Sequence, residues 1–301
     1  MKIFMTGGTG FVGGALTRRF VEDGNEVTVL ARAGDVRPML PEGAAYLDGD
    51  PNRPGAWQEE VGKHQAVVNL AGASIFKRWS EANKRIMRES RLRTTANVVA
   101  AMAGAGAERM SLISASAVGY YGSRGDEVLL EYSERGEGFL ADLAADWEEV
   151  AIGARESGCR VVLTRFGVVL GAGGGALEKL IPLFKRWLGS PLGSGKQWFS
   201  WIQQQDLVDG IAFLLKNPDL EGPVNFTAPE PVTNQEMTRI LGDVLGKPTF
   251  MPSVPRFALS AVMGERSSLL LDGQRALPGR LMDSGFSFRY PTLEEALKAS
   301  L

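Results

Sequence analysis

Short apolar segments alternate along the chain with longer stretches in which apolar residues recur at helical spacing. The apolar segments are residues 2–6, 26–32, 44–50, 65–73, 109–122 and 159–171. The longer stretches include 14–24, 79–103 and 139–155, and the first of them ends at Gly24, a plausible helix stop. Strands that alternate with helices in this way form a parallel sheet with both faces covered. The pattern therefore predicts an α/β fold with a doubly wound parallel sheet.

Small or polar residues stand where the third, fourth and fifth predicted strands end. They are Asp50, the run Asn69-Leu70-Ala71-Gly72, and the run Ser114-Ala115-Ser116. The carboxyl ends of parallel strands meet at one edge of such a sheet, where ligands bind. We therefore expect a ligand site at this edge.

Glycines separate the first predicted strand from the first predicted helix. Gly7, Gly10 and Gly13 form a G-x-x-G-x-x-G pattern within TGGTGFVG. A tight turn there needs a residue that tolerates positive φ, and a diphosphate can approach a backbone that carries no Cβ. The helix N-terminus then offers free N–H groups and a positive dipole end. In its strand-turn-helix context this pattern predicts a dinucleotide-binding Rossmann fold.

The end of the second predicted strand favours NADP(H) over NAD. An NAD site places an acidic residue there to hold the ribose hydroxyls, but this chain has Ala31 followed by Arg32. A guanidinium suits a 2′-phosphate, although Asp35 leaves the NAD interpretation open. The predicted cofactor-binding residues are Thr6, Gly7, Gly10, Phe11, Val12, Gly13, Arg32, Asp50, Leu70, Ala71, Gly72 and Ser114.

Composition limits the kinds of partner and of metal site that the protein can have. The formal net charge of −2 over 301 residues gives no general attraction to nucleic acid or to an anionic membrane. One cysteine, Cys159, excludes an internal disulfide and fits a cytoplasmic location. The only histidine, His64, excludes a metal site built on several histidines, and we expect it at the surface. The partner is therefore predicted to be a small molecule, and monomer and homodimer both stay open.

Several motifs resemble one known superfamily along essentially the whole chain. TGGTGFVG, NLAG and SASAVGYYG resemble the extended, sugar-nucleotide-epimerase-like branch of the short-chain dehydrogenases/reductases. The resemblance is closer to the subgroup of epimerase family proteins, on the motifs SRLRTT (90–95), SASAVGYYG (114–122), FLADLAADWE (139–148), FSWIQQQDLV (199–208) and the block 264–297.

That resemblance implies two parts of unequal size. The larger, NADP-binding part would comprise 1–170 and about 201–228. A smaller, mainly helical substrate-side cap would comprise 171–200 and 229–301, including the subgroup block at 250–299. Within these parts we expect Asp206 to cap the helix that follows it and 285–291 (GFSFRYP) to form a short strand.

The resemblance also shows where the expected chemistry is missing. The superfamily uses a tyrosine whose pKa is lowered by a lysine four positions later, but by register these positions are Phe139 and Leu143. The superfamily's asparagine corresponds to Arg91, and its serine is kept as Ser116, with Ser114 as the alternative register.

Tyr120 or Tyr121 could supply the missing acid, or both could only pack. On the substrate side the candidates are Arg91, Arg165, Trp198 and Trp201. The tryptophans would either stack on a base or sugar or anchor the two parts to each other.

Three functions follow from these residues. The first is an NADP(H)-dependent epimerase or oxidoreductase that acts on a nucleotide-sugar or similar polar metabolite with non-standard catalytic residues. The second is an NADPH-dependent reductase of a small carbonyl compound. The third is an NADP(H)-binding protein without turnover, which the replacements at Phe139 and Leu143 favour.

Overall fold

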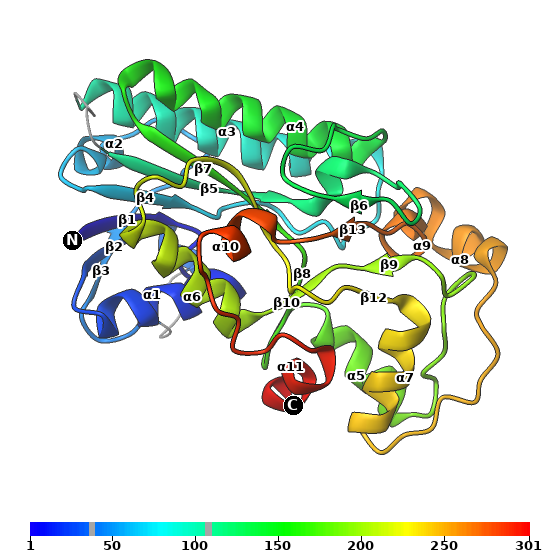
Figure 1. Cartoon of the computed structure of the whole chain (residues 1–301). Coiled ribbons are helices and arrows are strands. Elements are labelled where there is room, and N and C mark those ends of the chain that lie inside the picture. Colours follow the sequence, from blue (N-terminus) through cyan, green and yellow to red (C-terminus); the bar gives the residue numbers. More distant parts are fainter. Residues whose placement is uncertain (36–39, 106–109) are drawn as a thin grey trace.

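The computed structural model describes residues 1–35, 40–105 and 110–301, and its centre is a parallel sheet of seven strands (Figure 1). In chain order the strands are β1 (Lys2–Thr6), β2 (Glu26–Ala31), β3 (Ala44–Asp48), β4 (Ala66–Asn69), β5 (Ser111–Ala117), β7 (Arg160–Phe166) and β11 (Gly222–Phe226). Their order across the sheet is β11-β7-β5-β4-β1-β2-β3. The order changes direction between β1 and β4, which confirms the doubly wound prediction and places the switch point there.

The seventh strand, β11, was not predicted from the apolar pattern. It contains Gly222 and Pro223 and pairs only with β7. A proline is tolerated in a strand at the edge of a sheet, because one side of that strand needs no ladder hydrogen bonds.

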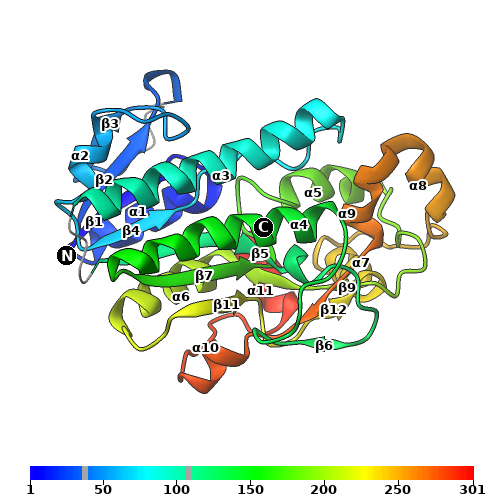
Figure 2. The same ribbon diagram turned by 90° about the horizontal axis from the view of Figure 1, so that it is seen from above.

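Helices cover both faces of the sheet (Figures 1 and 2). On one face lie α1 (Phe11–Glu22) and α6 (Gln204–Lys216); on the other lie α3 (Glu81–Gly104) and α4 (Phe139–Ile152), with the short α2 (Trp57–Val61) beside α3. Within β1, Ile3 and Met5 belong to the first core, while Phe4 belongs to the second. Because side chains alternate across a strand, a sheet buried on both faces requires the continuous apolar run at 2–6.

Shorter elements lie beside the sheet, and some of them form a third core. They are β6 (Val128–Leu129), β8 (Val168–Leu170), α5 (Leu177–Lys185), β9 (Trp198–Phe199), β10 (Trp201–Gln203), β12 (Val232–Thr233), α7 (Asn234–Val244), α8 (Arg256–Met263), α9 (Ser268–Leu271), β13 (Arg275–Ala276), α10 (Gly279–Asp283) and α11 (Leu293–Ser300). Four short 3₁₀ helices occupy 33–35, 118–121, 153–157 and 264–267. The third core gathers residues of α5, α7 and α11 around Trp201. The division into 1–170 with 201–228, and 171–200 with 229–301, stays a prediction.

Three local predictions were wrong. Gln203, not Asp206, caps α6, since its side chain accepts the Gln205 N–H. Residues 285–291 form no strand; the Arg289 and Tyr290 N–H groups donate to the Asp206 carboxylate and not to a neighbouring strand. His64 is buried: its Nε2 lies 2.9 Å from Thr28 Oγ1 and its Nδ1 lies 2.8 Å from the Glu60 carbonyl oxygen.

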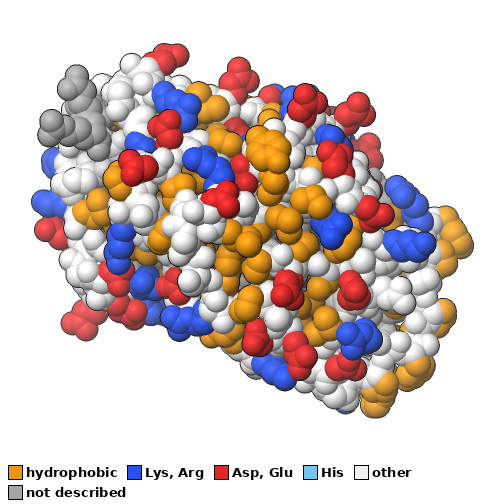
Figure 3. All heavy atoms as spheres, in the orientation of Figure 1, with side chains coloured by type: hydrophobic (Ala, Val, Ile, Leu, Met, Phe, Trp, Pro, Cys, Tyr) orange, Lys and Arg blue, Asp and Glu red, His pale blue; other side chains and the backbone are white. Residues whose placement is uncertain are grey.

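Charge is mixed over the face of the molecule seen in Figure 1. Figure 3 shows acidic and basic side chains interspersed there, with apolar side chains between them. Among the described residues, none of the helices combines the length and apolar character needed to cross a membrane.

Candidate functional site at the sheet edge

The turn between β1 and α1 is built from glycines that admit no side chain. Gly7 has φ +70°, and a Cβ there would lie 2.9 Å from the Ala71 nitrogen. A Cβ on Gly13 would lie 2.1 Å from the Gly7 carbonyl oxygen. Gly10 precedes the helix, its N–H donates to the Gly7 carbonyl oxygen at 3.0 Å, and its position carries no side-chain cap.

This helix end has the features of a phosphate cradle. The first turn of α1 contains no acidic residue, and no side chain caps it. The N-terminal N–H groups and the positive dipole end therefore favour an anion. The residues at this turn fit the diphosphate of a dinucleotide, as the glycine spacing predicted.

Buried polar side chains hold the neighbouring strand ends together. Thr6 Oγ1 donates to Asn69 Oδ1 at 2.7 Å and accepts the Ala71 N–H at 3.3 Å. Asn69 Nδ2 in turn donates to Thr95 Oγ1 at 2.8 Å and to Ser114 Oγ at 3.2 Å. The network brings Thr6, Ala71 and Ser114 to one edge, with Leu70 packed against the first core.

Two members of this network were missed from the sequence. Thr95 Oγ1 also accepts the Trp147 indole N–H at 2.9 Å. Both residues lie in motifs, SRLRTT and FLADLAADWE, that carried the family resemblance. The motifs were therefore the available signal, but hydrogen-bond partners far apart in sequence could not be read from them.

The ends of β2 and β3 lie side by side, with Ala31 paired to Asp48, so Arg32 and Asp50 each follow one of two neighbouring strand ends. Arg32 is exposed and directly follows β2. Asp50 Oδ1 accepts the Asn52 N–H at 3.0 Å, so this carboxylate closes a turn after β3. Asp48, which was not predicted, accepts the Ala33 N–H at 2.9 Å and so fixes the segment after Arg32. The side chain of Asp35 lies outside the described part of the structure.

A cavity of about 530 Å³ opens beside the glycine turn. Phe11 and Val12 of α1 line it, as do Phe139 and Leu143 of α4. The Phe139 ring meets Trp79 edge-on, with ring centroids 5.1 Å apart. Phe139 thus faces the cavity and does not pack beneath it. The two positions where the superfamily has tyrosine and lysine are apolar walls.

Ser116 lies at the base of this cavity and is hydrogen-bonded on its buried side. Its hydroxyl donates to Glu148 Oε1 at 2.6 Å, and only 3% of the residue is exposed. Arg165 donates to both oxygens of Glu148, at 2.8 Å each. The Ser116 oxygen therefore keeps its lone pairs free to accept a hydrogen bond from the cavity.

Arg165 continues the chain of polar contacts away from the cavity. Its Nη1 donates to Tyr121 Oη at 2.9 Å, and Tyr121 Oη donates to Asn225 Oδ1 at 2.7 Å. Its guanidinium also lies over the Tyr120 ring, 3.6 Å from the ring centroid. Arg165, predicted on the substrate side, is thus a buried framework residue that does not line the cavity.

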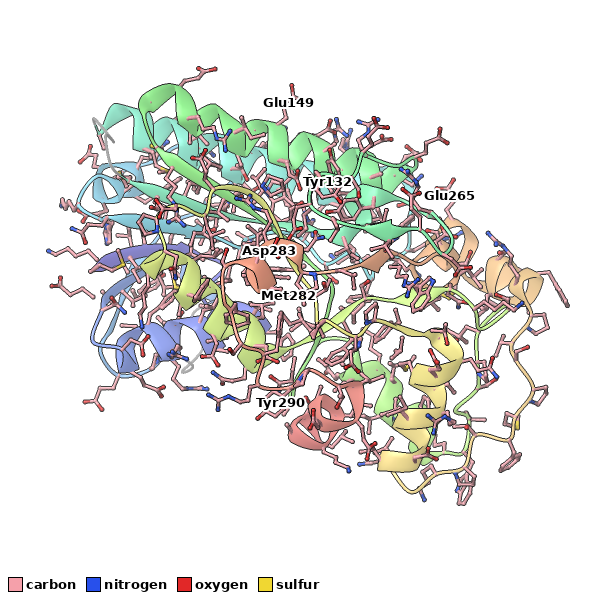
Figure 4. All side chains as sticks on the ribbon, viewed as in Figure 1. Tyr132, Glu149, Glu265, Met282, Asp283 and Tyr290 are labelled. Carbon is pink, nitrogen blue, oxygen red and sulfur yellow. The ribbon has the colours of Figure 1, made fainter. Side chains whose placement is uncertain are left out.

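Neither Tyr120 nor Tyr121 is placed to act as the missing acid. Neither lines the cavity. Tyr121 is fully buried, and desolvation raises the pKa of its hydroxyl to about 12. The geometry supports the packing alternative for both. Of the other tyrosines, Tyr132 projects from the loop before α4 and Tyr290 lies beside α11 (Figure 4).

Arg91 lines the cavity, and one nitrogen of its guanidinium already has two hydrogen-bond partners. Nη1 donates to the Ala73 and Met87 carbonyl oxygens, at 3.0 Å each, and the guanidinium lies 5.1 Å from the Trp147 ring centroid. Burial lowers the pKa of Arg91 to about 10. A Cβ on Gly72 would lie 3.1 Å from Arg91 Cζ, so Gly72 leaves room for the guanidinium.

The two tryptophans lie outside the cavity lining. Trp201 is completely buried in the third core, and its indole N–H donates to the Glu230 carbonyl oxygen at 3.1 Å. Trp198 donates to Asp126 Oδ1 at 2.8 Å and carries the Arg275 guanidinium on its ring, 4.4 Å from the centroid. Both positions support the anchoring alternative over stacking on a substrate.

Comparison with known proteins decides the family. The model described as the NAD dependent epimerase/dehydratase family matches residues 3–226. The chain belongs to this family. A second model, described as a domain of unknown function, matches residues 254–300, which overlaps the C-terminal block singled out from the sequence.

Three relatives cover the whole length of the chain. The epimerase family protein SDR39U1 homolog of Arabidopsis thaliana, named as chloroplastic, is 42% identical and covers 99% of this chain and 86% of its own. The human epimerase family protein SDR39U1, crystallised with NADPH, is 33% identical with a TM-score of 0.86, and covers 100% of this chain and 99% of its own. A nucleoside-diphosphate sugar epimerase of Corynebacterium glutamicum is 34% identical with a TM-score of 0.80. The match covers 100% of this chain and 58% of the epimerase. A cytoplasmic location stays a prediction for this chain.

Proposed function

We propose that this protein binds NADP(H) at the β1–α1 turn and uses it for oxidoreduction of a small carbonyl compound in the adjoining cavity. One observation carries the proposal: Phe11 and Val12 form the uncapped N-terminus of α1 and also line the cavity. A dinucleotide bound with its diphosphate at that helix end would therefore have the diphosphate next to the cavity. The NADPH in the human relative's structure supports the same cofactor here.

Arg32 supports the preference for NADP(H). Its position at the end of β2, where Ala31 replaces the acidic residue of an NAD site, suits a 2′-phosphate. The neighbouring carboxylates, Asp48 and Asp50, accept hydrogen bonds from their own turns. Those bonds fix the shape of the segment around Arg32.

The bound dinucleotide would supply the hydride, and the chain's own residues would position the substrate. Ser116 would accept a hydrogen bond from the hydroxyl of the alcohol form, because its own proton is directed at Glu148. Phe139 and Leu143 cannot move a proton, so the proton that accompanies the hydride would come from water. Turnover would therefore be slow relative to an enzyme with the usual tyrosine and lysine.

The same two residues favour a second candidate, an NADP(H)-binding protein without turnover. Their apolar side chains line the part of the cavity where the superfamily places its proton donor. The nucleotide-sugar epimerase predicted first has less support, because no titratable tyrosine lines the cavity.

A calorimetric titration with NADPH and with NADH tests the cofactor. We expect NADPH to bind at least roughly tenfold more tightly, and Arg32→Ala to remove most of that difference. Arg53→Ala is the matched control, because this arginine follows β3 nearby and its side chain is 85% exposed. Failure of both nucleotides to bind would refute the proposal at its base.

A second measurement separates the two candidates. The protein, NADPH and a panel of aldehydes and ketones are mixed, and the absorbance of the reduced nicotinamide is followed. Oxidation of NADPH that depends on one carbonyl compound supports the reductase. Tight NADPH binding with no turnover across the panel supports the binding protein.

A further inference from the structure

We infer that the cavity takes an uncharged ligand with an apolar body and a single oxygen function, and not a nucleotide-sugar. This deepens the proposed function by naming the class of its substrate. It rests on the walls of the cavity, on the charges among its lining residues and on the buried hydroxyl group of Ser116.

Aromatic and aliphatic side chains from separate elements form the walls. Trp79 and Phe139, which meet edge-on, both line the cavity, and so do Phe76 and Leu140. Val118 and Leu269 line it from the strand end of β5 and from α9. Burial of apolar ligand surface against these side chains favours binding. Sugar hydroxyls placed there would lose their hydrogen bonds to water without gaining new partners, which disfavours binding.

The charges among the lining residues oppose a diphosphate. Arg91 is the one cation that lines the cavity among the described residues, and two backbone carbonyls already occupy its Nη1. Two carboxylates, Glu137 and Asp272, line the same cavity. A second diphosphate, beside that of the cofactor, would meet two carboxylates there and a single cation, one nitrogen of which is already occupied.

Ser116 is the most deeply buried of the uncharged polar side chains that line the cavity; the others, Ser123, Ser268 and Gln274, are exposed or half-buried. Ser116 is 97% buried, its hydroxyl is directed at Glu148, and its oxygen faces the cavity. A ligand hydroxyl could donate to the Ser116 oxygen. A ligand carbonyl could accept from the Ser116 hydroxyl once that hydroxyl turns away from Glu148, whose two carboxylate oxygens Arg165 still holds. The apolar body of either ligand would lie against lining residues such as Phe139 and Leu269. Few precisely placed polar groups within an apolar lining are typical of sites for such ligands.

Calorimetric titrations with naphthyl methyl ketone, cyclohexyl methyl ketone and UDP-glucose test the inference. Each is run with and without NADP⁺, so that no reduction occurs. We expect at least one ketone to bind, UDP-glucose to show no saturable heat, and Phe139→Ser to weaken ketone binding roughly tenfold or more. Phe257→Ser is the control, since Phe257 is 76% exposed on α8 and does not line the cavity.

Leu269→Ser, at a lining residue of a different helix, serves as a second variant if Phe139→Ser does not fold. Saturable binding of UDP-glucose in competition with the ketone overturns the inference, as does ketone binding that neither cavity variant weakens. It is also overturned if neither ketone binds. If ketones bind as expected while NADPH does not, the inference about the cavity is supported and the proposed function fails. If NADPH binds while the ketones do not, the proposed cofactor is supported and the inference about the cavity fails.

Discussion

Arg165 of β7 holds Glu148 of α4 through two hydrogen bonds of 2.8 Å, one to each carboxylate oxygen. Both side chains are nearly inaccessible, at 4% and 6% exposure. The carboxylate also accepts the Ser116 hydroxyl, so the pair connects the sheet, the helix and the base of the cavity. Removing one partner of such a buried ion pair strongly destabilises the protein, because the other side chain is left charged and desolvated.

We therefore expect Arg165→Met to lower the free energy of unfolding by about 3–5 kcal/mol. Arg239→Met is the matched control, since Arg239 pairs with Asp243 at 3.0 Å but both side chains are about two-thirds exposed. The control should change stability by no more than about 1 kcal/mol. Both are measured by urea unfolding.

The double variant Arg165→Met/Glu148→Leu tests the cause of that loss. Removing both charges leaves no desolvated carboxylate, so we expect it to recover part of the stability lost in the single variant. A double variant that is less stable than Arg165→Met would show that packing, and not the unpaired charge, dominates.

The glycine turn offers a pair of adjacent substitutions with opposite expected results. A Cβ on Gly13 would lie 2.1 Å from the Gly7 carbonyl oxygen, so Gly13→Ala must distort the turn and should abolish NADPH binding. A Cβ on Gly14 would lie 3.8 Å from the Gly8 carbonyl oxygen, an ordinary van der Waals contact. Gly14→Ala should therefore keep binding and raise stability by roughly 0.5–1 kcal/mol, because alanine is the better helix former.

Calorimetry with NADPH and thermal unfolding of both variants check these expectations. Normal NADPH affinity in Gly13→Ala would mean that the turn can open without cost, and the assignment of the diphosphate to it would lose its main structural support.

The sheet could be predicted because its strands carry the signal themselves. Ile3 and Met5 enter one core and Phe4 the other, so both faces of β1 demand apolar residues and the run is visible in sequence. β11 carries a weaker signal, because an edge strand tolerates Gly222 and Pro223.

Side-chain roles were harder to predict because partners distant in sequence decide them. Arg165 and Tyr121 are polar groups near a predicted site, and nothing local shows that Glu148 and Asn225 occupy them. Trp201 is equally uninformative alone, since its burial depends on α7 and α11. The absence of the tyrosine and lysine, by contrast, was visible at Phe139 and Leu143, because helix register is local.

Because Tyr121 is buried, we expect the stability of the protein to fall at alkaline pH. Desolvation raises its pKa in the folded protein to about 12, from an ordinary value of 10.0. The folded state thus keeps its proton when the unfolded state has lost it, and stability that is fully present below pH 10 is lost as pH rises toward 12. The loss attributable to this group is about 1.4 kcal/mol per pH unit within that window.

Tyr121→Phe isolates the effect because phenylalanine does not titrate. At pH 8 the variant should be less stable than the wild type, since Asn225 loses a hydrogen bond, but the difference should shrink above pH 10. Tyr132→Phe, at a side chain that is 84% exposed and points away from the core, should follow the wild type throughout (Figure 4). A difference between wild type and Tyr121→Phe that stays constant to pH 11 would contradict a raised pKa.

Asp206 ties the C-terminal segment to α6 and provides the last test. Its two carboxylate oxygens accept the Arg289 and Tyr290 N–H groups, at 2.7 and 3.0 Å, and the residue is 1% exposed. Asp206→Ala would leave both N–H groups without an acceptor. The loss of each hydrogen bond to the charged carboxylate would lower the free energy of unfolding by about 1.5–3 kcal/mol. We expect a fall of about 3 kcal/mol in unfolding free energy, together with faster amide exchange at Arg289 and Tyr290. Asp243→Ala, at an exposed partner of a surface ion pair, should change neither quantity appreciably. If Asp206→Ala lost stability while exchange at these two amides stayed unchanged, the carboxylate would act within α6 and not as the anchor of the C-terminal segment.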